Sequence, residues 1–446
     1  MVDKHQPSSN IIKVVAASMA GTTVEWYDFF LYGVAAAVVF PAVFFPSSDP
    51  AVGTLLALGT FAIGFIARPI GGLVFGHFGD KIGRKTLLVV SLVMMGVATF
   101  AIGLLPGYAT IGLAAPLLLV LLRLIQGFAL GGEWGGAVLI VSEHGDAKRR
   151  GYWASWPQAG VPFGQLLANG LLFLLSAVQS QDDFNSWGWR IPFLLSAVLV
   201  LIGLYVRLSV EESPVFKAAQ ARAAEQAAAG EKETMPIVEV FRRYPREVFT
   251  AMGARFAENV AYYIFTIVIT TYVTKRLGLP SSFVLGAVLI GAAFHLVTIP
   301  IWGALSDRFG RKPIYLLGAT GVGIWAFVFI ALVDTRNFGL TVLAVVGGLL
   351  FHGAMYGPQA AFLSELFGTK VRYSGVSIGY QLASVVAGGL APVVAVALYT
   401  AFDSGYAVSV YVALSAVVTI VAVATYGETR DRDLAEDPAR PRTAAR

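Results

Sequence analysis

A small set of charged and histidine side chains lies inside long apolar stretches of this chain. Its members are Glu25, Asp28, Arg68, Arg123, Glu133, Arg255, Glu258, His295 and His352. A charge at the centre of a hydrocarbon layer costs about 2.5–3.5 kcal/mol, so each of these groups needs a partner or a water-filled cavity. Burial favours the neutral, protonated form of a carboxyl group, whereas the planar guanidinium group is well matched to a carboxylate. Such a set of side chains can bind protons and organic anions.

Helical spacing predicts which of these groups meet. Glu25 and Asp28 are three residues apart and share one helix face. Glu133 follows Arg123 by ten residues, which is about 15 Å along a helix, so these two groups cannot pair. We therefore expect Arg123 to pair with Asp28 or Glu25. Protonation of that carboxylate would free the guanidinium group for an anion, and the proton and the anion would bind cooperatively.

The same reasoning applies to Arg255, Glu258 and Asn259, which share a face in the second half of the chain. The predicted substrate-binding residues are Arg123, Arg255, Gln158, Asn259 and His352. The predicted proton-coupling residues are Glu25, Asp28, Glu133 and Glu258. An alternative interpretation, in which these groups only lock helices together, stays open. We expect His295 to be structural, and Arg68 to serve packing or gating.

The composition predicts the elements that position these side chains. The chain is 57% hydrophobic and only 13% charged, and its mean hydropathy is +0.71, whereas soluble domains carry about 25% charged residues. A bilayer core about 30 Å thick needs roughly 20 apolar residues per helix. Twelve such stretches lie near residues 12–40, 52–78, 86–106, 114–142, 152–178, 189–208, 247–274, 282–306, 313–333, 340–366, 372–400 and 406–427. The sequence therefore predicts an all-α membrane protein with twelve transmembrane helices.

A duplicated charged loop divides these spans into two groups of six. The segment from Gly76 to Lys85 resembles the segment from Gly303 to Lys312, 227 residues later. A second repeat relates Glu143 and Arg150 to Glu365 and Arg372, at an offset of 222 residues. Two repeats in register predict two six-helix bundles packed face to face, the plan of many secondary transporters.

The repeated loops also predict a gate of ion pairs at the helix ends. Its expected members are Asp80, Arg84, Glu143, Arg150, Asp307, Arg311, Glu365 and Arg372. Positive charge alone would be explained by membrane orientation, but orientation does not explain the paired acidic residues. We expect these pairs to hold the two bundles together when the cavity between them faces outward.

The distribution of Lys and Arg predicts the orientation in the membrane. The loops on one side hold 18 of these residues and the loops on the other side hold three, so the positive-inside rule places both termini in the cytoplasm. The predicted division is an N-terminal bundle over 1–209, a cytoplasmic linker with a surface helix over 210–246, and a C-terminal bundle with a short tail over 247–446.

Several sequence strings resemble one family. The two loops, in the context of six plus six helices, resemble the major facilitator superfamily. Within it, the strings resemble the metabolite:proton symporter family and its bacterial shikimate and organic-acid permeases. These strings are Glu25-Trp26-Tyr27-Asp28-Phe29, Gly131-Gly132-Glu133-Trp134-Gly135-Gly136, Ser186-Trp187-Gly188-Trp189-Arg190-Ile191-Pro192-Phe193, Glu211-Glu212-Ser213-Pro214 and Val371-Arg372-Tyr373-Ser374-Gly375. The resemblance covers nearly the whole chain and implies proton-driven uptake of carboxylates, or of proline and betaine.

We therefore expect a proton-coupled symporter for a small organic anion, either shikimate-like or a mono- or dicarboxylate, in the bacterial inner membrane. Uptake of a zwitterion such as betaine or proline is the alternative, and a receptor or an anion channel is a remote one. We expect no enzymatic activity, no metal, no cofactor other than the proton gradient, no nucleic-acid partner and a monomeric state. The chain has no cysteine, which excludes disulfides and thiolate metal sites.

Overall fold

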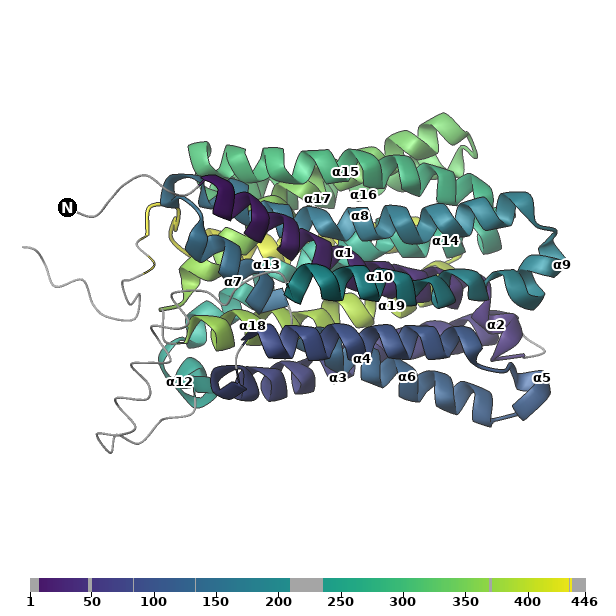
Figure 1. The fold of residues 1–446 in the computed structure, drawn as a ribbon. Helices are drawn as coiled ribbons and strands as arrows, with labels where there is room; N and C mark the ends of the chain where they lie inside the picture. The colour runs from purple at the N-terminus through teal and green to yellow at the C-terminus, as the bar shows by residue number, and fades with distance from the viewer. Residues whose placement is uncertain are drawn as a thin grey trace, which may run out of the picture.

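The computed structural model of the protein describes residues 8–46, 50–82, 84–132, 134–208, 236–368, 371–432 and 434. In these ranges the regular structure is helical throughout, and the long helices run side by side between two ends of the molecule (Figure 1). One end carries the start of α1, α12 and the start of α18, and we call it the terminal end. The other end carries the short helices α2, α5 and α9, and we call it the distal end.

The first half of the chain begins with one long helix and ends with another. Its helices are α1 (Ser8–Val38), α2 (Phe40–Val43), α3 (Pro50–Ile82), α4 (Arg84–Leu104), α5 (Tyr108–Ile111), α6 (Ala114–Gly131), α7 (Trp134–His144), the 3₁₀-helix η1 (Ala147–Arg149), α8 (Arg150–Val178), α9 (Gln181–Asp183), the π-helix η2 (Phe184–Gly188) and α10 (Arg190–Leu208).

The second half follows a short helix, α12 (Pro236–Arg243). Its remaining helices are α13 (Pro245–Tyr263), the π-helix η3 (Ile264–Val268), α14 (Ile269–Thr271), the π-helix η4 (Tyr272–Arg276), α15 (Ser281–Phe309), α16 (Arg311–Asp334), α17 (Phe338–Leu366), α18 (Arg372–Ala383), the π-helix η5 (Ser384–Gly389), α19 (Ala391–Ala401) and α20 (Tyr406–Ala424).

Most of these helices can cross a bilayer. Among the described residues, 11 helical stretches have the length and hydropathy of a membrane span. The 31-residue helix α1 has the length of a twelfth span, but its buried Glu25 and Asp28 make it more polar than the others. The predicted all-α fold with twelve spans in two bundles is confirmed, and the side of the membrane on which the termini lie stays a prediction.

The two halves meet along several helices. α8 of the first half packs most extensively against α15 of the second, and it also contacts α17. On the other side of the interface, α3 packs against α18, η5 and α19. The predicted boundaries of the two bundles and the linker stay predictions, and the predicted surface helix of the linker lies outside the described residues.

Glycine allows helices within the first bundle to approach closely. A Cβ atom on Gly127 of α6 would lie 1.9 Å from the carbonyl oxygen of Gly64 on α3. A Cβ atom on Gly64 itself would lie 2.6 Å from Nε of Arg123. Gly64 therefore leaves the space that the buried guanidinium group of Arg123 occupies.

Candidate functional site

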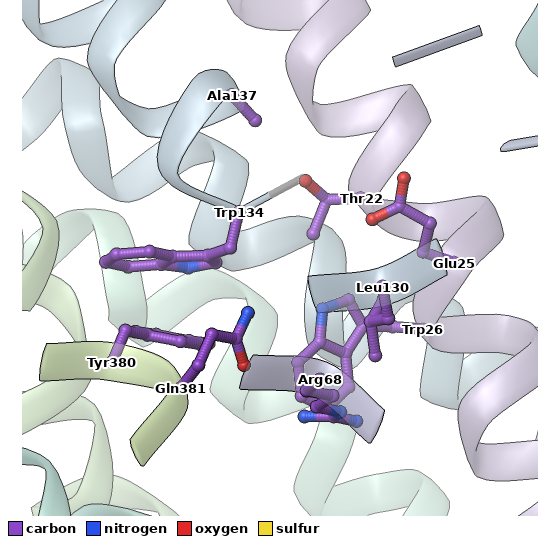
Figure 2. A pocket seen from close by; sticks show the side chains of 9 residues that line it. All are labelled: Thr22, Glu25, Trp26, Arg68, Leu130, Trp134, Ala137, Tyr380 and Gln381. Atoms are coloured by element: carbon purple, nitrogen blue, oxygen red, sulfur yellow. The ribbon is translucent and has the colours of Figure 1, made fainter. Parts of the chain in front are cut away.

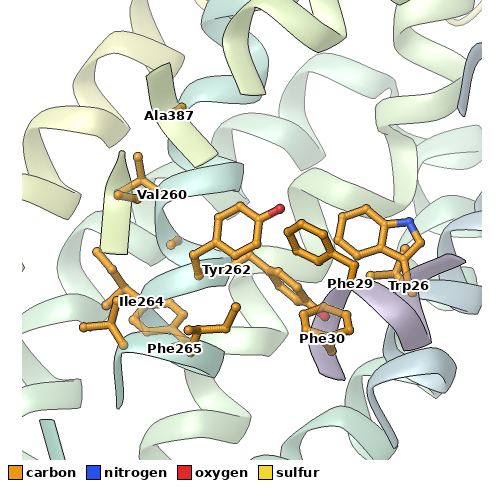
Figure 3. Close-up of a cluster of buried hydrophobic side chains, with 14 of the residues drawn as sticks. Trp26, Phe29, Phe30, Val260, Tyr262, Ile264, Phe265 and Ala387 are labelled. Carbon is orange, nitrogen blue, oxygen red and sulfur yellow. The ribbon is translucent and has the colours of Figure 1, made fainter. Parts of the chain in front are cut away.

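The centre of the interface between the halves is a layer of aromatic rings. Phe29 and Phe30 of α1 face Tyr263 and Tyr262 of α13, with ring centroids 5.9 and 5.8 Å apart. Figure 3 shows Trp26, Phe29 and Phe30 gathered against Tyr262. All five side chains are buried. The charged groups at this level of the molecule are therefore shielded from water.

A small pocket opens beside this layer and is lined from both halves (Figure 2). Its lining residues are Thr22, Glu25, Trp26, Arg68, Leu130, Trp134, Ala137, Tyr380 and Gln381. The rings of Trp134 and Tyr380 stack across the interface with centroids 3.7 Å apart. The pocket has room for about one water molecule, so a larger solute requires the halves to separate.

Arg68 of α3 reaches into this pocket. Its guanidinium carbon lies 4.0 Å from the ring centroid of Phe65 and 4.7 Å from that of Phe29. The side chain is 2% exposed, and within the described part of the chain it has no carboxylate partner. The expectation that Arg68 serves packing or gating stays a prediction. The Arg-Pro sequence does not reveal that the side chain points into the pocket.

Arg123 of α6 is also buried, and its surroundings are not those that we predicted. Nη1 donates to Oε1 of Gln126 at 3.1 Å, and the guanidinium carbon lies 4.2 Å from the ring centroid of Tyr32. The amide of Gln126 in turn donates to Thr99 at 2.8 Å. The predicted pairing of Arg123 with Asp28 or Glu25 is wrong in this structure, and Nε of Arg123 has no hydrogen-bond partner among the residues described.

The two carboxylates of α1 lie in different surroundings. Glu25 accepts from Nη2 of Arg207 at 2.8 Å. Arg207 lies in the last turn of α10. Asp28 is 1% exposed, and neither of its carboxyl oxygens has a hydrogen-bond partner in the described ranges. The first half thus contains two arginines and one aspartate that are buried without an ion-pair partner among these residues.

In the second half, by contrast, the charges are paired. Nη1 of Arg255 donates to Oε2 of Glu258 at 2.6 Å, as the spacing on α13 predicts. Gln359 of α17 lies between them: it accepts from Arg255 at 2.9 Å and donates to Glu258 at 3.3 Å. The Gln359 amide also donates to the Tyr315 hydroxyl at 2.8 Å. The guanidinium carbon of Arg255 lies 3.3 Å from the ring centroid of Tyr380, so Arg68 and Arg255 approach the pocket from opposite halves.

Two histidines extend this network away from Glu258. Nε2 of His352 lies 3.1 Å from Oε1 of Glu258, and Nδ1 of His352 lies 3.0 Å from Nε2 of His295. We expected His295 to be structural, but it adjoins a predicted functional residue. Its position depends on how α15 crosses α17, which no local sequence pattern specifies.

The predicted amide ligands mainly link helices. Gln158 accepts from Nε1 of Trp134 at 2.8 Å and donates to the carbonyl oxygen of Tyr356 at 3.4 Å. Asn259 donates to Oγ of Ser384 at 3.4 Å. The same hydroxyl accepts from Nε of Arg255 at 3.3 Å. Both amides border the central charges, and their role in substrate binding stays a prediction. Sequence analysis did not identify Ser384, Gln359 or Tyr315, because uncharged polar residues are common in membrane helices.

At the terminal end, two acidic residues of the second half contact the first half. Oε1 of Glu365 accepts from Arg150 of α8 at 2.9 Å and from Arg311 at 3.3 Å. Asp307 accepts from the backbone N–H groups of Gly151 and Tyr152, both at 2.8 Å. Those two N–H groups lie in the first turn of α8 and have no carbonyl partner within the helix, and the helix dipole favours negative charge there. The end of α8 is therefore anchored to the opposite half.

The other predicted gate residues are only partly described. Arg372 donates to the carbonyl oxygens of Ser364 and Phe367 at 3.0 and 3.2 Å, and also to that of Leu434. The side chains of Asp80, Arg84 and Glu143, and the whole of Glu133, lie outside the described residues. The structure brings together Arg150, Asp307, Arg311 and Glu365, and their role as a gate stays a prediction.

Known proteins resemble this chain over almost its whole length. Residues 13–439 match the family model for sugar (and other) transporters. The chain is 43% identical over 437 residues to the inner membrane metabolite transport protein YhjE of Escherichia coli (strain K12), with 97% of each chain covered. It is 42% identical to the shikimate transporter of the same organism, with 90% of each covered. It is 35% identical to the proline/betaine transporter of that strain, covering 95% of this chain and 84% of that protein.

A solved structure has the same fold. The proton:xylose symporter XylE, a major facilitator superfamily protein, superposes with a TM-score of 0.75 at 20% identity, covering 97% of this chain and 99% of the other. At this level of identity the similarity supports the fold and carries no information on substrate.

Proposed function

Because the chain belongs to the sugar (and other) transporter family of the major facilitator superfamily, we propose that it is a proton-coupled symporter that imports a small organic anion. The predicted family resemblance is confirmed, as are a transport function in place of an enzymatic one and a location in the inner membrane. The proposed substrate is shikimate-like, or a mono- or dicarboxylate. The monomeric state and the independence from cofactors stay predictions.

The observation that carries this proposal is the pair of buried arginines in the first half. Arg68 and Arg123 have no carboxylate partner among the described residues, and aromatic rings cover both guanidinium groups. A buried, unpaired charge is costly. The carboxylate of a bound substrate would supply the missing partner in the bidentate geometry that guanidinium groups favour.

The paired network of the second half would couple this anion to a proton. Glu258 is held by Arg255, Gln359 and His352. Protonation of Glu258 would remove the negative charge beside Arg255 and make the surroundings of the pocket more positive. An anion would then bind more tightly, and by linkage a bound anion would favour protonation to the same extent.

Alternating access would open the two ends of the interface in turn. Glu365 and Asp307 contact α8 of the opposite half at the terminal end, and we propose that these contacts keep that end closed. We propose that this end is cytoplasmic, as the distribution of Lys and Arg predicts. Release of substrate into the cell would then require these contacts to break.

Uptake of a zwitterion is a second candidate, supported by the rings around the pocket. Trp26, Trp134 and Tyr380 could surround a quaternary ammonium group by cation–π interactions. The proline/betaine transporter of E. coli is one of the similar proteins. The unpaired Arg68 and Arg123 nevertheless favour a substrate with net negative charge.

Uptake into proteoliposomes tests this proposal. The purified protein would be given labelled shikimate, 2-oxoglutarate, citrate, betaine or proline, with and without an inward proton gradient. We expect the gradient to drive accumulation of an acid, and a protonophore to abolish it. Accumulation of betaine or proline alone would establish the second candidate, and acid uptake at one rate whatever the gradient would contradict proton coupling.

A further inference from the structure

Three buried side chains from three helices form a continuous hydrogen-bonded row. Glu258 lies on α13, His352 on α17 and His295 on α15, with exposed fractions of 3%, 1% and 0%. The nitrogen–oxygen distance from His352 to Glu258 is 3.1 Å, and the nitrogen–nitrogen distance between the histidines is 3.0 Å. Each contact is within hydrogen-bond range, so the row can pass protons from one group to the next.

The chemistry of the end group fixes the direction of these hydrogen bonds. Glu258 is ion-paired with Arg255, so its carboxylate accepts and Nε2 of His352 donates. A neutral imidazole carries one N–H, so Nδ1 of His352 is an acceptor and Nε2 of His295 must donate to it. Nδ1 of His295 is then left as a bare lone pair. It is buried and has no hydrogen-bond partner in the part of the chain that is described.

We propose that His295 is the entry point for the transported proton and that the two imidazoles carry it to Glu258. This inference rests on the proposed function, because it assigns the path for the coupling proton of that symporter. It also assigns a transport role to a residue that sequence analysis had left as structural.

The transfer balances at every atom. A proton adds to Nδ1 of His295, and the proton on its Nε2 moves to Nδ1 of His352. The proton on Nε2 of His352 then moves to Oε1 of Glu258. Both histidines end neutral with the proton on Nδ1, and Glu258 ends as a neutral acid that no longer holds Arg255 by charge. The reverse sequence restores the starting tautomers and releases the proton at His295.

The surroundings make Glu258 the natural end of this path. The titratable groups that face the row are Arg255, Tyr262 and Tyr263 from α13, Tyr356 from α17, Tyr315 from α16 and Tyr380 from α18. From α8 the adjoining polar group is the uncharged Gln165, which accepts from the Tyr262 hydroxyl at 3.0 Å. Among the described residues around the row, Glu258 is therefore the carboxylate that can receive the proton.

The position of His295 also fits alternating access. Its helix, α15, forms the main contact with α8 of the other half. Separation of the halves along α8 and α15 would bring water to this helix, first from one end and then from the other. The rings of Tyr262 and Tyr356 lie against the imidazoles, with centroids 4.8 and 5.3 Å from that of His352. They separate the row from water while the interface is closed.

Replacement of His295 tests the proposal. His295→Gln can still hydrogen-bond to Nδ1 of His352 but cannot relay a proton, and His295→Phe keeps the ring without nitrogen. Uptake of labelled shikimate, 2-oxoglutarate and citrate would be measured in proteoliposomes under a proton gradient, and exchange would be measured at equal pH. In exchange, one substrate molecule enters for each one that leaves, so no net transfer of protons across the membrane is needed. His5→Gln is the matched control, because it removes a histidine that precedes α1 in the sequence.

We expect both His295 variants to lose gradient-driven uptake by about a hundredfold or more while exchange is retained, and His5→Gln to behave as wild type. Retained driven uptake in either variant would overturn the proposal. Equal loss of driven uptake and exchange would also overturn it, because it would show a structural role. Wild-type protein that accumulates none of the acids in response to the gradient would contradict the proposed function itself, independently of the His295 variants.

A measurement on unmodified protein keeps the proposal testable if the variants do not fold. Nitrogen-15 NMR of histidine-labelled protein distinguishes the two neutral tautomers. We expect His295 and His352 to carry the proton on Nε2 at high pH, and both to carry it on Nδ1 at low pH. If the tautomers of these two residues did not change with pH, or if either carried the proton on Nδ1 at high pH, the relay would be overturned.

Discussion

The two halves of this protein treat buried charge in opposite ways. In the second half, Arg255 and Glu258 form an ion pair that Gln359 and His352 complete. In the first half, Arg68 and Arg123 lie among aromatic rings with no acidic partner within the described residues. The charged groups that the two bundles place at their shared interface therefore differ: they are paired in the second half and unpaired in the first.

This difference assigns a role to each half. A paired network changes its charge when a proton arrives, because Glu258 can become neutral and leave Arg255 unpaired. Unpaired guanidinium groups are suited to a ligand that brings its own negative charge. We infer that the second half binds the proton and the first half binds the anion.

The largest effect is expected from Glu258→Gln. The amide keeps the size of the side chain and one of its two acceptor oxygens but cannot take up a proton. Gradient-driven uptake of shikimate, 2-oxoglutarate or citrate should fall by about a hundredfold or more, while exchange at equal pH is retained. Proteoliposome assays in both modes check this result. A variant that still concentrates the acid would remove Glu258 from the coupling mechanism.

Arg123→Gln and Arg68→Gln should weaken substrate binding. A charged hydrogen bond contributes about 1.5–3 kcal/mol, so KM should rise roughly 10- to 100-fold for each variant. The dependence of uptake on the proton gradient should persist, because Glu258 is intact. Arg190→Gln is a matched control on α10: its guanidinium carbon lies 4.3 Å from the ring centroid of Trp189, away from the pocket. An unchanged KM in both pocket variants would contradict anion binding by the first half.

Glu365→Gln should open the terminal end. It removes the carboxylate that Arg150 and Arg311 share across the interface, and leaving a buried charge unpaired costs about 3–5 kcal/mol. The chain has no cysteine, so Ser155→Cys on α8, beside Gly303 of α15, reports access to this region. Maleimide should label that cysteine faster when Glu365→Gln is added. Equal labelling rates would show that Glu365 does not hold the end closed.

The smallest effect on transport is expected from Glu25→Gln. Glu25 is held by Arg207 at 2.8 Å, and we now expect it to be structural, in contrast to the coupling role inferred from sequence. The variant should lower the melting temperature by a few degrees, in line with a loss of about 1–3 kcal/mol, and keep the number of protons moved per substrate. A changed stoichiometry would return Glu25 to the coupling site.

The fold could be read from the sequence to a large extent. Long apolar runs predicted the spans, and the duplicated loop predicted two bundles. The spacing of three residues predicted the pair of Arg255 and Glu258, because both lie on one helix. Local periodicity alone is enough for features of this kind.

Contacts between helices could not be predicted in the same way. Arg207 reaches Glu25 because α10 packs beside α1, and His295 reaches His352 because α15 packs beside α17. Which residues face each other across two helices depends on their rotation and depth, which one sequence does not specify. Glycine offered one usable signal, since Gly64 leaves room for Arg123.

The most direct test of the division between the halves is the number of protons taken up when the anion binds. Calorimetric titration of the purified protein with the transported acid, in buffers of different ionisation enthalpy, measures this number. The account predicts uptake of about one proton per anion by the wild type, none by Glu258→Gln, which still binds, and greatly weakened binding by Arg123→Gln. Proton uptake that persists in Glu258→Gln, or anion binding that is unchanged in both Arg68→Gln and Arg123→Gln, would contradict it.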